Sequence, residues 1–129
     1  MPLSRLSSPR RSTTDIQPVL DDLLRHIEAT AAPMAVFLIG SYLGGTADEF
    51  SDIDLVIVIA DSLNPQDASF QIARDRPHRS IALDLMCMTQ SEFNRMADVG
   101  GIAFEAKHHG RLLSGKSSEM LCKPIGGNP

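Results

Sequence analysis

Two aspartates separated by one residue, Asp52 and Asp54, open an apolar run that continues as Leu-Val-Ile-Val-Ile. On an extended segment side chains alternate between the two faces. Both carboxylates therefore point to one face, with their Cα atoms about 6.6 Å apart. Two carboxylates on one face can converge on a hard cation such as Mg²⁺, which prefers oxygen ligands and leaves room for substrate phosphates. The pair therefore predicts a metal site at the entrance of a strand.

A third carboxylate, Asp84, is the only charge in a largely apolar stretch from Ser80 to Met88, which we interpret as another strand. An isolated buried aspartate is costly, so Asp84 must be paired, exposed at a cleft or bound to metal. If its strand lies beside the strand of Asp54, all three carboxylates share one face, and Asp84 supplies a third ligand.

A glycine–serine pair, Gly40 and Ser41, follows the apolar run from Ala35 to Ile39. A short helix that started at Ser41 would offer amides and a hydroxyl to phosphate oxygens. Gly44 and Gly45 keep the next loop free of side chains, and the stretch is not a P-loop because no Gly-Lys-Ser/Thr follows. Each feature alone is also typical of an ordinary turn or strand entrance, so the functional interpretation depends on their combination.

The elements that position these residues are predicted from the spacing of apolar side chains. A stripe of apolar residues predicts an amphipathic helix that ends near residues 31–33, with Thr14 or Asp15 as its cap and Pro18 in its first turn. The members of the stripe are Ile16, Val19, Leu20, Leu23, Leu24 and Ile27. The run over 55–59 has no polar alternation, which predicts a strand covered on both faces.

The remaining pattern predicts a single sheet with helices packed against it, an α/β or α+β layer. The first expected elements are a strand over 35–39, a turn over 61–65, a helix over 65–74 with Ala68, Ile72 and Ala73 inside, and a loop over 74–79. A strand over 80–88 follows, and then a helix capped by Thr89 or Ser91 with Phe93, Met96 and Ala97 inside. The last elements are a break at Gly100 and Gly101, a helical segment over 102–108, and a short strand or turn over 110–114.

Length and composition indicate one domain of ordinary globular type. The chain has 129 residues, of which 43% are hydrophobic and 22% charged, and this composition excludes a wholly disordered chain. Residues 1–13 are predicted to be a disordered arm, 14–115 the folded domain and 116–129 a flexible tail. The formal charge of −4 disfavours nucleic acid as the main partner without ruling it out.

Cysteines and hydropathy point to a cytoplasmic protein without a membrane partner. Cys87 and Cys122 make no disulfide framework, and Cys87 is expected to be a reduced core residue. Residues 1–13 lack the apolar core of a signal peptide, and no apolar run approaches the length of a membrane span. The histidines at 26, 78, 108 and 109 are interpreted as surface or loop residues without a catalytic role.

Several of these motifs together resemble the signature of the nucleotidyltransferase family related to DNA polymerase beta. They are Gly40-Ser41, Gly45 and Ser51-Asp52-Ile53-Asp54-Leu55. The nearest branch is that of the small stand-alone (minimal, or MNT-type) nucleotidyltransferases, and the resemblance runs over about residues 15–115. Asp84 and the residues after it are similar to the family's strand with the third acidic residue, and 105–115 to its closing helix and strand. The chain departs from the pattern at Gly44, where many relatives carry a basic residue.

The resemblance implies a nucleotidyltransferase fold with a mixed sheet, a nucleoside triphosphate (taken as ATP) as donor, and two Mg²⁺ ions. It assigns nucleotide binding to Gly40, Ser41, Gly45 and Ser51. It assigns catalysis and metal binding to Asp52, Asp54 and Asp84. The implied reaction is in-line attack of an acceptor hydroxyl on the α-phosphate, with Asp84 assisting deprotonation and pyrophosphate leaving.

Three functions follow as hypotheses. The leading one is a Mg²⁺-dependent transferase that moves a nucleoside monophosphate, AMP from ATP, to a hydroxyl on a partner protein. Small relatives of this kind commonly work beside a helical HEPN-type subunit in toxin–antitoxin pairs, so we expect such a partner or a homo-oligomer. The alternative is a non-catalytic antitoxin or scaffold that binds nucleotide or a helical partner, motivated by Gly44. A third, nucleic-acid modification, is disfavoured by the acidic charge.

Overall fold

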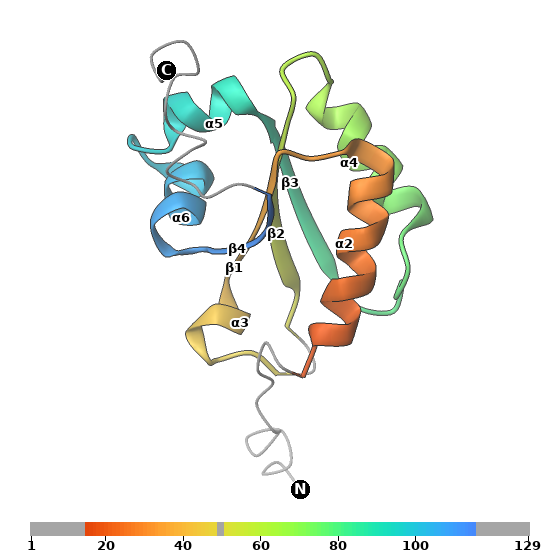
Figure 1. Ribbon diagram of the computed structural model, residues 1–129. Helices are drawn as coiled ribbons and strands as arrows, with labels where there is room; N and C mark the ends of the chain where they lie inside the picture. Colours follow the sequence, from red (N-terminus) through yellow and green to blue (C-terminus); the bar gives the residue numbers. More distant parts are fainter. Residues whose placement is uncertain (1–14, 49–50, 116–129) are drawn as a thin grey trace, which may run out of the picture.

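The computed structural model describes residues 15–48 and 51–115 and forms a sheet covered by helices on both faces (Figure 1). In chain order the elements are α2 (Gln17–Ala31), β1 (Ala35–Ile39), α3 (Ser41–Gly44), β2 (Ile53–Ile59), α4 (Pro65–Asp75), β3 (Leu83–Thr89), α5 (Gln90–Met96), α6 (Gly101–His109) and β4 (Arg111–Gly115). The predicted arm and tail, Thr14 and Cys122 lie outside the described residues.

The sheet is mixed, as predicted. Its four strands lie in the order β3-β2-β1-β4. β1 pairs antiparallel with both β2 and β4, whereas β2 and β3 are parallel and are joined through α4. Figure 1 shows α2 and α4 on one side of the sheet and α5 and α6 on the other. Each side has its own cluster of buried side chains, so both faces of the central strands are covered.

Helix α2 buries the predicted stripe. Ile16, Leu20, Leu23 and Ile27 are buried, and Val19 and Leu24 pack against the same cluster. The predicted cap is wrong for Asp15, because the residue at the N-cap is Ile16, and no side chain there bonds the helix amides. Ile16 is only 2% exposed, so burial of this apolar side chain, rather than a polar cap, sets where the helix begins.

The two central strands confirm the interpretation of both apolar runs. All five residues of β1 are buried. In β2 the alternate residues from Ile53 to Ile59 pack toward α2 and α4, while Val56 and Val58 pack toward α5 and α6. Strand β2 starts two residues before the predicted run, because Ile53 is also fully buried and Asp54 pairs with Ile39.

Three predicted boundaries or faces are wrong. β3 begins at Leu83 instead of Ser80, because the Arg76 guanidinium donates to the carbonyls of His78 (3.0 Å) and Ile81 (2.8 Å) and so folds the preceding segment into a compact loop. Ala73 is exposed, since α4 contacts the core only through Ala68 and Ile72. Met96 is 38% exposed and lies at the rim of a cavity instead of in the core.

The start of α5 confirms Thr89 as the cap. The Thr89 hydroxyl accepts from the Glu92 amide at 3.2 Å, and the Glu92 carboxylate accepts from the Thr89 amide at 3.0 Å, which makes a capping box. The Asp61 carboxylate adds a second anchor, since it accepts from the Ser91 amide at 2.9 Å. The break before α6 also agrees with prediction: Gly101 has φ 77°, a conformation that favours glycine.

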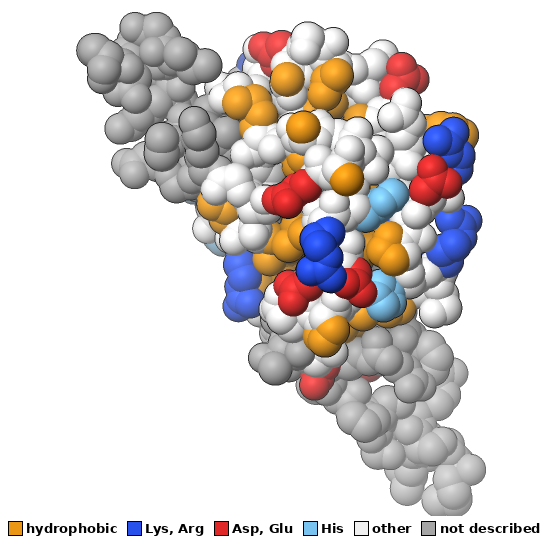
Figure 2. Space-filling model, turned by 45° about the vertical axis from the view of Figure 1, so that its right-hand side comes forward, with side chains coloured by type: hydrophobic (Ala, Val, Ile, Leu, Met, Phe, Trp, Pro, Cys, Tyr) orange, Lys and Arg blue, Asp and Glu red, His pale blue; other side chains and the backbone are white. Residues whose placement is uncertain are grey.

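On the face seen in Figure 2, acidic, basic and histidine side chains alternate with apolar ones instead of gathering by sign. Within the described ranges, no helix combines the length and apolarity needed to cross a membrane.

Stacked aromatic rings join α5 to the sheet and give a test of the second core cluster. The rings of Phe37 and Phe93 are 5.4 Å apart between centroids and nearly parallel. Phe93→Ala removes a fully buried ring, so we expect the free energy of unfolding to fall by about 3–5 kcal/mol in urea denaturation. The matched control is Phe70→Ala, because Phe70 is 64% exposed and its ring lies under the Arg74 guanidinium, 5.8 Å from the ring centroid; its cost should stay below about 1 kcal/mol. Equal losses would contradict this packing.

Candidate active site

The register of the parallel pair β2–β3 places Asp54 directly opposite Asp84. Each aspartate is the second residue of its strand, so both lie at the same end of the sheet. Residues paired across adjacent strands point to the same face, here the face shared with Val56 and Met86 and covered farther along by α5 and α6. The predicted juxtaposition of the two strands and of these two carboxylates is therefore confirmed.

Asp52 completes the acidic group from just outside the sheet. It is exposed and precedes the first residue of β2, so the prediction that it belongs to the strand is off by one residue. Asp54 is half-buried, and its pKa is raised, first by burial and then by the negative charges of Asp84 and Asp52. The three carboxylates are thus close enough to repel one another.

Gly40 forms one wall of this acidic group. It follows β1, whose last residue pairs with Asp54, and it has φ 88°, where L-side chains are strained. A Cβ built on Gly40 would lie 2.3 Å from Asp54 Oδ2. Glycine is therefore required here by two independent constraints, and its Cα is the surface against which the Asp54 carboxylate rests.

The four-residue helix α3 begins at Ser41, as the phosphate-binding interpretation requires. The Gly40 carbonyl accepts from the Leu43 amide (3.0 Å). Gly45 caps the end of α3 in the left-handed conformation, and its amide donates to the Ser41 carbonyl. Ser51 Oγ accepts from the Asp48 amide at 3.0 Å. Two of the predicted nucleotide-binding residues, Gly40 and Ser41, border an open space. The other two, Gly45 and Ser51, make hydrogen bonds within the segment that follows α3.

That open space is a cavity of about 460 Å³ between α3 and the end of α6. Its lining consists of Gly40, Ser41, Leu43, Gly44, Thr46, Glu105 and His109. Glu105 and His109 are residues that sequence reasoning missed. No local sequence signal could have found them, because it is the antiparallel pairing of β4 with β1, aligning Arg111 with Leu38, that brings the end of α6 next to Gly40.

The acidic group has the right chemistry for a divalent cation, although it is not gathered into a site. Within residues 15–48 and 51–115, no three His, Cys, Asp or Glu side chains are arranged to hold a metal ion as they stand. The donors are carboxylate oxygens, which Mg²⁺ prefers, and the raised pKa of Asp54 records a repulsion that a bound cation would relieve. Asp84 was expected to be paired, exposed at a cleft or bound to metal, and in the structure it is exposed. We conclude that the donor set fits a hard divalent cation.

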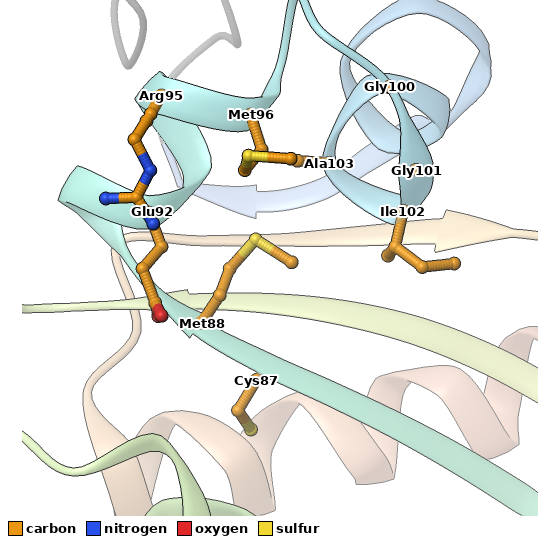
Figure 3. A pocket seen from close by; sticks show the side chains of 9 residues that line it. All are labelled: Cys87, Met88, Glu92, Arg95, Met96, Gly100, Gly101, Ile102 and Ala103. Atoms are coloured by element: carbon orange, nitrogen blue, oxygen red, sulfur yellow. The ribbon is translucent and has the colours of Figure 1, made fainter.

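A second cavity, of about 250 Å³, lies between α5 and α6 and is lined by no aspartate (Figure 3). In Figure 3, Met88 from β3 and Met96 from α5 point toward one another across it, and Ile102 of α6 lies beside them. Cys87 contributes to its lining, but burial raises the pKa of this thiol, which disfavours the reactive thiolate. The cavity offers apolar packing, and the acidic group is the stronger candidate for chemistry.

Comparison with known families assigns the chain to a class. Residues 20–113 match the nucleotidyltransferase domain, so the chain belongs to that family, and it is a nucleotidyltransferase of the polymerase beta-like type. The matched segment contains the acidic group, Gly40 and the whole sheet except the last residues of β4. None of the curated protein sequences compared with this chain matches it.

Two solved structures are similar to the chain, and the first of them supports the same fold. One is the crystal structure of the toxin–antitoxin pair MntA-HpeT in a variant with two aspartates changed to glutamate: TM-score 0.54, 16% sequence identity, and coverage of 79% of each chain. A second structure of that pair, with a tyrosine changed to alanine, has TM-score 0.47, 20% identity and coverage of 82% of this chain and 79% of the other. At 16% identity the first likeness establishes the fold.

The contact between Gly40 and Asp54 predicts a contrast between two glycines. Gly40→Ala places a methyl group on the Asp54 carboxylate at a positive φ, so we expect the free energy of unfolding to fall by at least about 2 kcal/mol. Gly44→Ala is the matched control: the nearest atom to its added Cβ is Thr46 Oγ1 at 3.9 Å, and the residue is helical. Its stability should be unchanged or raised by up to about 1 kcal/mol in urea denaturation. A neutral Gly40→Ala would contradict the packing of Asp54.

The repulsion within the acidic group predicts how Asp54 titrates. Asp84→Asn removes one neighbouring charge, so the pKa of Asp54 should fall toward the ordinary 3.8 but stay above it, because burial is the larger cause. Carboxyl ¹³C NMR titration measures this. A raised folded-state pKa means that Asp54 costs stability as pH rises from 3.8 through the folded value. Asp84→Asn should therefore be the more stable protein above that window and gain nothing below it. An unchanged pKa would show that the two carboxylates do not interact.

Proposed function

We propose that the protein transfers a nucleoside monophosphate, AMP from ATP, to a hydroxyl on a partner protein in a Mg²⁺-dependent reaction. The observation that carries the proposal is the register of β2 and β3, which sets Asp54 opposite Asp84 beside Gly40. Membership of the nucleotidyltransferase family supplies the reaction class. The proposal includes ATP as the donor, two Mg²⁺ ions, the acceptor and a cytoplasmic location, where ATP is plentiful.

Each member of the site has a role that its environment suits. Gly40 and Ser41 line the cavity beside the acidic group, where phosphate oxygens can approach the backbone and the Ser41 hydroxyl. Gly45 and Ser51 act on the nucleotide through the loop that they shape. Asp52, Asp54 and Asp84 hold the cations, which when bound neutralise charge on the phosphates. Burial of Asp54 strengthens its hold on a cation, because few waters compete there.

Asp84 is the residue that would receive the proton of the acceptor hydroxyl. It is exposed, and β3 is the edge strand of the sheet, so an acceptor can approach from outside the molecule. Asp54 lies on the inner strand between Asp84 and Gly40. The donor phosphates therefore sit on the β1 side of Asp54 and the acceptor on the β3 side, an order that suits in-line transfer between them.

A protein acceptor is favoured by an exposed apolar surface on the same face of the sheet, at the far end of β3 from Asp84. Met96, Val99 and Ile102 are large apolar side chains exposed around α5 and α6, on the face of the sheet that carries the aspartates. Exposed apolar groups of this kind mark contact surfaces for other proteins. One solved structure of similar fold contains a toxin–antitoxin pair. We propose a helical, HEPN-type subunit as the partner; a second copy of this chain is the competing outcome.

A second candidate function is a non-catalytic antitoxin or scaffold with the same fold. Two observations favour it: α3 carries no basic residue, since Gly44 stands in its last turn, and the described carboxylates are not gathered around a metal position. On this alternative the protein binds nucleotide or a helical partner without transferring anything. Neutralisation of a partner that survives Asp52→Asn with Asp54→Asn would favour it.

Transfer can be tested directly with ATP labelled at the α-phosphate. The full chain is incubated with Mg²⁺, alone and with the co-expressed product of the adjoining gene, and label on protein and released pyrophosphate are measured. Asp52→Asn with Asp54→Asn should reduce transfer at least about a hundredfold, since charge stabilisation by bound metal is worth several kcal/mol. Asp75→Asn, an exposed aspartate on α4, should leave it unchanged. Nucleotide binding with no transfer to either protein would turn the assignment toward the scaffold.

A further inference from the structure

We propose that His109, at the end of α6, binds the terminal phosphates of the donor nucleotide and supplies the cationic contact that α3 lacks. The inference rests on the proposed function, because it concerns the same nucleotide. It adds a residue from a different element, more than fifty positions away from the motifs at Gly40 and Asp54. No covalent step is involved: the imidazole holds and positions the phosphate chain.

The two sides of the α3–α6 cavity differ in the side chains that they present. Its α3 side, from Gly40 to Thr46, carries hydroxyls and backbone but no charged side chain. Among the described residues that line it, the titratable side chains are Glu105 and His109, both on α6. A triphosphate chain carries several negative charges and is held by donors, so of these two the imidazole is the group that can bind it. An imidazole N–H donates to a phosphate oxygen in either protonation state.

Neighbouring groups in the last turn of α6 are engaged elsewhere. Lys107 Nζ donates to Asp98 Oδ1 at 2.7 Å, and His108 Nε2 lies 3.2 Å from the same oxygen. His109 is one position farther, about 100° around the helix, and its ring centroid is 6.2 Å from that of Phe104. Two of the three basic residues are therefore directed to Asp98, and the third lines the cavity with Gly40 and Ser41.

The backbone holds His109 in this position. Gly110 follows it, and a Cβ there would lie 2.6 Å from the Ala106 carbonyl oxygen and 3.1 Å from Ile39 Cγ2. The absence of a side chain lets the end of α6 pack directly on the end of β1. β4 then continues from Arg111 in antiparallel register with Leu38. The imidazole is thus fixed near Gly40 by the sheet itself instead of by a loop.

The cavity has a size suited to this role. Its volume of about 460 Å³ falls within the range of roughly 300–1,000 Å³ that is usual for small-ligand sites. Gly40 borders both this cavity and the Asp54 carboxylate, so a phosphate chain that runs along Gly40 would reach from the acidic group toward His109. Glu105, one turn before His109 on α6, lines the same cavity.

The test measures equilibrium binding of MgATP and, separately, of inorganic tripolyphosphate by competition. His109→Leu should weaken both about fivefold, the size expected for one hydrogen bond to a charged group at a partly exposed site. His109→Arg should restore both, because it returns a nitrogen donor at that position. His108→Leu, the matched control next in sequence, should bind both as the wild type does. Urea denaturation of each variant separates a binding loss from unfolding.

Three results would overturn the inference. One is equal affinity of His109→Leu and the wild type for MgATP. Another is a loss for MgATP with none for tripolyphosphate, which would place His109 against the nucleoside. A third is equal weakening by His108→Leu, which would make the effect one of general charge. Failure of the inference alone leaves labelled transfer by the wild type intact, whereas failure of the proposed function removes transfer and MgATP binding from the wild type as well.

Discussion

The contact on which the site depends is that between the Asp54 carboxylate and the bare Cα of Gly40. Asp54 is held half-buried on the central strand β2, with Asp84 opposite and Asp52 two residues before it. Its raised pKa reflects the cost of that placement, first by burial and then by its acidic neighbours. Carboxylates with pKa values raised in this way are found at cation-binding sites, because a bound positive charge relieves their repulsion and so gains binding energy.

Two features of the fold make that placement possible. The crossover through α4 returns the chain to a strand parallel to β2, so the entrances of both strands, each with its aspartate, fall at one end of the sheet. The antiparallel turn from β1 brings Gly40 to the same end. The two core clusters, one on each face, fix these three strands in register and leave only their ends free to carry polar groups. The chemistry therefore sits at the end of the sheet next to α3, while the middle is packed.

The groups of the site lie in a definite order across the end of the sheet. The cavity with His109 lies on the β1 side, Asp54 in the centre, and Asp84 on the exposed edge strand. A donor held at one side and an acceptor admitted at the other is the arrangement that a group transfer needs, since under the proposed function the two substrates must meet at the three carboxylates without competing for space. The family membership and this order of groups support one another, although they rest on different observations.

The sequence by itself determined the local elements and the identity of the acidic group. The stripe of α2, the apolar runs of β1 and β2 and the Thr89 cap follow from spacing and side-chain chemistry that act over a few residues, and the structure bears them out. Local rules failed where distant contacts decided the outcome. Burial of Ile16 displaced the expected cap, and the hydrogen bonds of Arg76 delayed the start of β3. The approach of Glu105 and His109 to Gly40 was decided only by the tertiary structure, because it depends on β4 pairing antiparallel with β1 across more than seventy positions of sequence, and no periodicity within α6 or β4 encodes which strand they will meet.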